Sequence, residues 1–214
     1  MTWDFLVEAL PSMTQATLAT IWISAVAVAI GFVVGVPLAV ACDGAPGWGR
    51  RAALAYVSFF RGVPLLIQLL LAYYALPFIG IDLPPLVAAI GTLGLCCAAY
   101  MAEIIRGGFA LVPKGGLEAA RLLGLTPRQT LLRIRLPISA QAMRPALISE
   151  AILIVKASSL ISVVGILELT RSAQALASST FEPLPAYALC GAIYLVINLA
   201  LTLLARGRVE GRAV

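Results

Sequence analysis

The stretch Glu118–Pro137 reads EAARLLGLTPRQTLLRIRLP and is the longest polar, positively charged interruption in an otherwise apolar chain. Leu117–Leu123 contains no helix breaker, and Gly124 can end a helix there because glycine adopts positive φ without a Cβ clash. Residues 126–129 read TPRQ, which is the pattern of a capping box with proline at the first helical position. The stretch, called the basic elbow below, therefore predicts two short helices joined by a tight turn, one of them amphipathic and basic.

Charged residues are absent from several segments long enough to cross a membrane. The chain has 214 residues, 61% hydrophobic and 12% charged, whereas a soluble domain carries about 25% charged residues. Four stretches without Asp, Glu, Lys or Arg each reach the roughly 20 residues that a helix needs to span a bilayer. We expect a single all-α membrane domain over residues 1–214. Its five predicted spans are residues 14–42, 54–77, 85–105, 139–167 and 185–205, with a polar connector over 169–184.

The basic residues fall on one side of this topology. Five spans put the termini on opposite sides, so the first and third connectors and the C-terminal tail share a side. Its bases are Arg50, Arg51, Arg106, Lys114, Arg121, Arg128, Arg133, Arg135, Arg206, Arg208 and Arg212. The positive-inside rule then places the N-terminus outside the cell and the C-terminus in the cytoplasm. Residues 108–138 become a cytoplasmic loop within the domain.

Close helix contact is predicted where small residues recur. Gly31 and Gly35 have small-xxx-small spacing in the first span, and Gly91, Gly94 and Ala98 give the third span a slim face. In the second span, Gly and Pro at residues 62–64 free backbone groups that need new partners, so that site must be buried in protein or wet.

Polar side chains inside the predicted spans are the candidates for contact with a transported solute, since such groups are costly in a bilayer. The candidates are Arg61, Gln68, Glu103, Lys156, Ser158 and Ser159. Glu103 and Arg106, three apart on one helix, can simply form an ion pair. Glu150 and Lys156 are six apart and lie on different helix faces, so each needs a partner elsewhere. Lys156 is the strongest candidate for a ligand carboxylate, with snorkelling or structural pairing as the alternative.

The sequence contains no motif typical of a catalytic, metal-binding or nucleotide-binding site. Histidine is absent, which excludes a Ser/His/Asp triad and weakens a proton relay or a histidine–metal site. No GxxxxGK[ST] pattern occurs, so the chain cannot supply a phosphate-binding P-loop. Cys42, Cys96, Cys97 and Cys190 form no CxxC pair, and we interpret them as packing residues. We expect no catalytic residue, no metal and no cofactor on this chain, and a transport role.

The basic elbow resembles the EAA motif of ABC-importer permeases. Glu118, Ala119, Ala120 and Gly124 have the spacing of that motif. The motif ends with an Ile-x-Leu-Pro pattern, which this chain has at residues 134–137. In that family the loop carries a coupling helix that docks into a cleft on a separate ATPase. The resemblance implies a type I ABC importer permease, with ATP bound and hydrolysed by the partner subunit. The implied coupling residues are Glu118, Ala119, Ala120, Arg121, Gly124 and Arg128.

Further stretches are similar to the polar amino acid branch of these permeases, which serves histidine, glutamine, glutamate, arginine and opines. RGVPLLIQ at 61–68, AYMAEIIRGG at 99–108 and VPKG at 112–115 match that branch. The chain departs from the branch at Gly116, where Gln is usual, and at Ala157, where a carboxylate is common. The second departure leaves open whether this subunit binds the amino acid directly.

The resemblance implies an importer in the bacterial inner membrane. Its expected partners are an ABC ATPase, a second permease, identical or different, and an extracytoplasmic solute-binding protein. Two alternatives remain open: a permease for another small solute, such as methionine, phosphonate or an osmolyte, and an ATP-independent secondary transporter. The sequence offers no nucleic-acid-binding feature.

Overall fold

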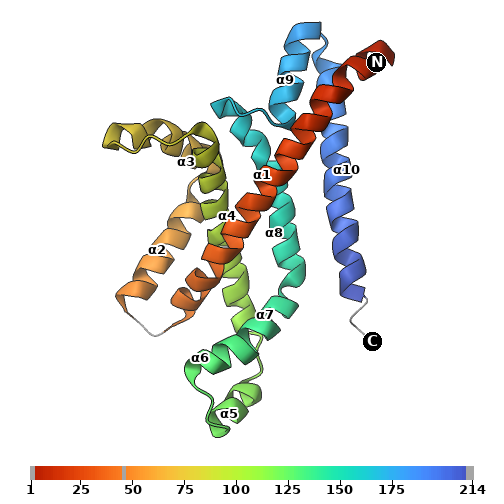
Figure 1. Ribbon diagram of the computed structural model, residues 1–214. Coiled ribbons are helices and arrows are strands. Elements are labelled where there is room, and N and C mark those ends of the chain that lie inside the picture. The colour runs from red at the N-terminus through yellow and green to blue at the C-terminus, as the bar shows by residue number, and fades with distance from the viewer. Residues whose placement is uncertain (1–2, 45–46, 211–214) are drawn as a thin grey trace.

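A computed structural model describes residues 3–44 and 47–210, with side chains described for 9–44 and 47–205. The described residues are helical, with no strand among them. Figure 1 shows long, roughly side-by-side helices, with the start of α1 and all of α9 at one end. The helices of the basic elbow lie at the other end, toward which α10 also runs (Figure 1). Of the basic tail, Arg212 and the side chains of Arg206 and Arg208 lie outside the described part.

The described elements are all helices, which follow one another without a sheet. In chain order they are α1 (Trp3–Asp43), α2 (Trp48–Gly62), α3 (Leu65–Leu70), η1 (Leu71–Ala75), η2 (Leu76–Ile79), α4 (Pro85–Phe109), α5 (Lys114–Leu122), α6 (Pro127–Thr130), η3 (Leu131–Arg135), α7 (Leu136–Ala142), α8 (Arg144–Ala157), η4 (Ser158–Val164), α9 (Leu169–Thr180) and α10 (Pro183–Glu210). η1 and η3 are π-helical turns, and η2 and η4 are 3₁₀ helices.

The expectation of about five spans is confirmed, with one span in two pieces. Four helices are long and apolar enough to cross a bilayer, and a bent pair makes the fifth. The four are Ala9–Asp43, Pro85–Phe109, Arg144–Val164 and Pro183–Ala205, and the pair is Trp48–Gly62 with Leu65–Ile79. The fourth span begins later than residue 139, because the chain leaves helical geometry at Met143 before Pro145, which has no N–H to donate.

The most extensive helix contact is between α1 and α4, and glycines make it possible. A Cβ on Gly31 would lie 2.5 Å from the Cys97 Sγ, and one on Gly94 would lie 2.7 Å from the Ile30 Cγ2. Both distances are too short for a real Cβ, so α1 and α4 can approach this closely only because glycine stands at these positions. This agrees with the small-residue faces predicted from the sequence. A Cβ on Gly91, by contrast, would meet nothing within 4 Å, so this glycine is not part of the contact.

The second span bends by 106° between α2 and α3. The break frees backbone carbonyls, as the glycine and proline there predict. Gln68 supplies the new partner: its Nε2 donates to the Phe60 carbonyl at 2.8 Å and to the Val63 carbonyl at 2.7 Å. A side chain from the second half of the span therefore braces the first half across the bend.

The connector predicted over 169–184 contains a helix, α9, that the sequence analysis did not foresee. The buried Glu168 caps it, since its carboxylate accepts hydrogen bonds from the backbone N–H groups of Thr170 at 2.9 Å and Arg171 at 2.7 Å. The hydroxyl of Tyr194 on α10 donates to the same carboxylate at 3.1 Å. Burial raises the pKa of Glu168 above its usual 4.5, although the N–H donors pull the other way.

Candidate functional site

The basic elbow has the local structure that its sequence predicts. α5 ends at Leu122, and Gly124 follows with φ 72°, the left-handed conformation that favours glycine. Thr126 then caps α6: its hydroxyl accepts from the Gln129 N–H, and the Gln129 side chain accepts from the Thr126 N–H at 2.9 Å. The capping box with its proline is confirmed, so the direction of the second helix is fixed by local hydrogen bonds.

The turn of the elbow presents apolar side chains to its surroundings. Leu122 is 89% exposed and Leu123 is 80% exposed, which is unusual for two adjacent leucines outside a bilayer. The predicted coupling residues Glu118, Ala119, Arg121, Gly124 and Arg128 are exposed as well, whereas Ala120 is buried at 1% exposure. Ala120 therefore packs inside the elbow, and the others form an outer surface that is both apolar and basic.

Glu118 lies free on that surface. In the described part of the chain, no hydrogen bond or ion pair involves its side chain, so it does not hold the loop internally. Its carboxylate is available to a group outside this chain.

A cavity of about 440 Å³ lies where the α2–α3 break faces α4 and α8. Its polar lining comes from Arg61 on α2, Tyr100 on α4 and Glu150 on α8, and its remaining lining residues are Gly62, Val63, Pro64, Leu65, Cys96, Leu153, Ile154 and Ala157. Glu150 is only 6% exposed and so presents a carboxylate in a mostly apolar wall. The Arg61 guanidinium lies 5.5 Å from the centre of the Tyr100 ring.

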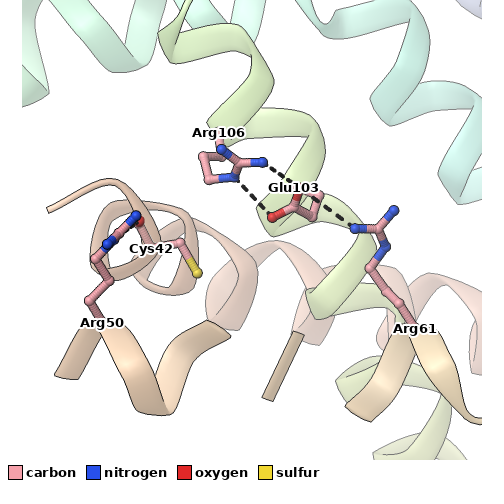
Figure 2. Close-up of polar contacts among 5 residues, drawn as sticks. All are labelled: Cys42, Arg50, Arg61, Glu103 and Arg106. Atoms are coloured by element: carbon pink, nitrogen blue, oxygen red, sulfur yellow. Dashed lines mark hydrogen bonds and ion pairs between the residues drawn. The ribbon is translucent and has the colours of Figure 1, made fainter. Parts of the chain in front are cut away.

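Glu103 connects this cavity to the end of α4. Figure 2 shows its carboxylate between two guanidiniums. Arg106 donates two hydrogen bonds to it, at 2.9 and 2.8 Å, and the Arg61 Nη1 lies 3.5 Å from its Oε2. The predicted Glu103–Arg106 pair is therefore present, and it is shared with Arg61 from a different helix. This link holds the start of the break against α4.

The other predicted solute-contacting residues are placed differently. Both N–H groups of the Gln68 amide donate hydrogen bonds to backbone carbonyls across the bend. Ser158 donates to the Val155 carbonyl and Ser159 to the Lys156 carbonyl, each at 2.8 Å. Lys156 is exposed and lies outside the cavity lining, whereas Ala157 is part of it. Of the six predicted residues, the structure places only Arg61 in the cavity wall, with Glu103 bound to it.

Tyr100 and Glu150 line the cavity beside Arg61 but are not among the six predicted solute-contacting residues, and the sequence marked Glu150 only as a charge that needs a partner elsewhere. Glu150 was visible as an ionisable residue within a span, and that feature marks pathway residues. Its cavity partners were not, because they come from helices about fifty and ninety residues away in sequence.

The chain is similar to known transport proteins over nearly its whole length. The glutamine transport system permease protein GlnP of Escherichia coli (strain K12) is 34% identical over 213 residues, covering 98% of this chain and 96% of the relative. The nopaline transport system permease protein NocM of Agrobacterium fabrum (strain C58) is 35% identical over 205 residues, covering 91% and 85%.

A crystal structure of an amino acid ABC transporter with histidines is also similar. It superposes with a TM-score of 0.89 at 34% identity, covering 98% of this chain and 99% of that chain. Residues 31–207 match the family described as binding-protein-dependent transport system inner membrane component. The chain therefore belongs to that family, the membrane-spanning permeases of ABC importers, and the resemblance in its sequence is confirmed.

Proposed function

We propose that this chain is the permease subunit of an ATP-driven importer for polar amino acids or opines. The observation that carries the proposal is the outer surface of the basic elbow, where Leu122 and Leu123 are exposed beside Arg121 and Arg128. Two exposed leucines on a rigid, capped turn are suited to a hydrophobic cleft on another protein. A separate ABC ATPase is the partner that such a permease requires.

The remaining parts of the machine follow from the same role. A second permease, identical or different, completes the path, and an extracytoplasmic binding protein delivers the solute. The chain carries no ATP and no cofactor, and its N-terminus faces outward while its C-terminus and the elbow, residues 108–138, face the cytoplasm. Closure of the ATPase pair would rock the spans between outward-open and inward-open states, as alternating access requires.

The substrate class is supported by the cavity and by the relatives. Arg61 offers a guanidinium and Glu150 a carboxyl group in one chamber, and these groups complement the carboxylate and ammonium of an amino acid. Two relatives are permease proteins of glutamine and nopaline transport systems, and a solved neighbour is described as an amino acid ABC transporter with histidines. Lys156, Ser158 and Ser159 stay candidates for solute contact in a state other than the one described here.

The test is co-purification in detergent with the ABC ATPase proposed as its partner. The Leu122→Asp/Leu123→Asp double variant places two carboxylates on the docking surface. The control is Leu184→Asp, since Leu184 is 81% exposed at the start of α10, away from the elbow. The wild type and the control should retain the ATPase and the double variant should lose it. Retention by all three proteins would refute docking at the elbow.

A further inference from the structure

An ion pair joins the end of the first span to the basic elbow. The Arg135 Nη2 donates to the Asp43 Oδ2 at 2.5 Å, although the residues are 92 positions apart. Asp43 is the last residue of α1, and Arg135 is the last residue of the π-helical turn η3. The contact therefore connects the segment expected to meet the ATPase with the end of the first span.

The surroundings of Arg135 distinguish this pair from an ordinary surface ion pair. Its guanidinium carbon lies 4.5 Å from the centre of the Phe109 ring, at the end of α4. The two charged side chains are 26% and 29% exposed, and the Arg135 Nε is buried without a hydrogen-bond partner. Arg135 cannot swing away without losing both contacts, so it links α1 to α4 at this position.

Apolar packing supports the same junction. Phe109, Ala39 and Cys42 belong to one buried cluster at the ends of α1, α2 and α4. Leu131 and Leu136, on either side of Arg135 in the elbow, pack against this cluster. Arg133 lies between them in sequence but is exposed. The second half of the elbow thus packs against the ends of the spans, and Arg135 adds a polar contact with α1 at the same place.

We propose that Asp43, Arg135 and Phe109 form a clasp that transmits movement of the elbow to α1 and α4. The clasp residues are positioning residues: they face the span ends and not the exposed turn at Leu122 and Leu123. This inference rests on the proposed function, because it assigns the clasp to coupling between ATP hydrolysis and transport. It separates docking, which the exposed turn performs, from transmission, which the clasp performs.

The variants are Asp43→Asn, Arg135→Gln and their double, with Arg133→Gln as the control that loses the same charge two residues away. Each is purified with its ATPase and reconstituted in proteoliposomes, and solute uptake per ATP hydrolysed is measured. Both single variants should keep the ATPase bound, while uptake per ATP falls about fivefold or more, the lower end of typical coupling between sites. The double should fall no further than the worse single, because one contact is lost in each case. The charge-reversed Asp43→Arg/Arg135→Asp variant should recover part of the ratio.

Three results would overturn the clasp: an unchanged ratio in both single variants, an additive loss in the double, or loss of the bound ATPase in the singles. A measurement on the permease alone keeps the inference independent of its partners. The free energy of unfolding in detergent is measured for the wild type, Asp43→Asn, Arg135→Gln and their double variant. The losses of the two single variants should not add up in the double variant. Additive changes in the free energy of unfolding would refute the clasp, whether or not the wild type binds an ATPase. Failure of the wild type to bind any ATPase would refute the proposed function instead.

Discussion

Replacing Gln68 by leucine should loosen the bend between α2 and α3. The side chain is 4% exposed, and its Nε2 is the donor for the carbonyls of Phe60 and Val63. Leucine has a similar volume, so the main loss is the two hydrogen bonds. Each buried polar group left without a partner costs about 1–3 kcal/mol, so the two carbonyls together would cost about 2–6 kcal/mol.

Two effects reduce the expected loss. Carbonyl groups tolerate under-satisfaction better than N–H groups, and the buried Gln68 Oε1, which has no partner, disappears with the amide. We therefore expect the free energy of unfolding to fall by about 1–3 kcal/mol in total.

The assay is unfolding of the purified permease in mixed micelles, paired with the solute concentration at half-maximal uptake. The control is Gln141→Leu, which removes an exposed amide and should change stability by less than about 0.5 kcal/mol. If Gln68→Leu left the stability unchanged and only weakened solute affinity, Gln68 would be a solute ligand, as its sequence position first suggested, and the bracing role would be refuted.

Three further predictions concern other parts of the fold. Gly31→Ala should destabilise α1 against α4 by about 1–3 kcal/mol in the same unfolding assay, because its Cβ would overlap the Cys97 side chain, whereas Gly91→Ala should not. Because burial raises the pKa of Glu168 above 4.5, the folded state binds that proton more tightly than the unfolded state. The stability of the wild type relative to Glu168→Gln should therefore rise as the pH falls toward 4.5, and a flat difference would contradict this. At Gly124, with φ 72°, Asn should preserve uptake and Val should reduce it through about 1–2 kcal/mol of backbone strain. Asp, which adds a carboxylate to the docking surface, should abolish uptake without loss of membrane insertion; normal uptake by the Asp variant would contradict coupling at this position.

The sequence predicted best what depends on neighbours along the chain. The turn at Gly124 and the cap at Thr126 follow from residue types within one helical turn, and both are present. All the spans except the one that holds Glu150 and Lys156 follow from long charge-free segments in the same way. Helix α9 was missed because its cap is Glu168, which is not among the preferred capping residues.

Features that depend on distant residues could not be predicted. Arg61 and Gln68 look alike in sequence as polar residues in a span, yet one lines the cavity and the other braces the bend. Only the packing of α2, α4 and α8 decides which is which. The Asp43–Arg135 contact likewise depends on where the elbow folds back onto α1, which no local pattern contains.

The most direct test of the central claim is solute uptake into proteoliposomes that hold this permease with its ATPase and any second permease, supplied with the binding protein. Uptake of a polar amino acid or opine should require ATP in the compartment that the basic elbow faces. It should stop in the Leu122→Asp/Leu123→Asp variant and should be indifferent to an imposed pH gradient. Uptake driven by a pH gradient in the absence of ATP would contradict the account and identify a secondary transporter.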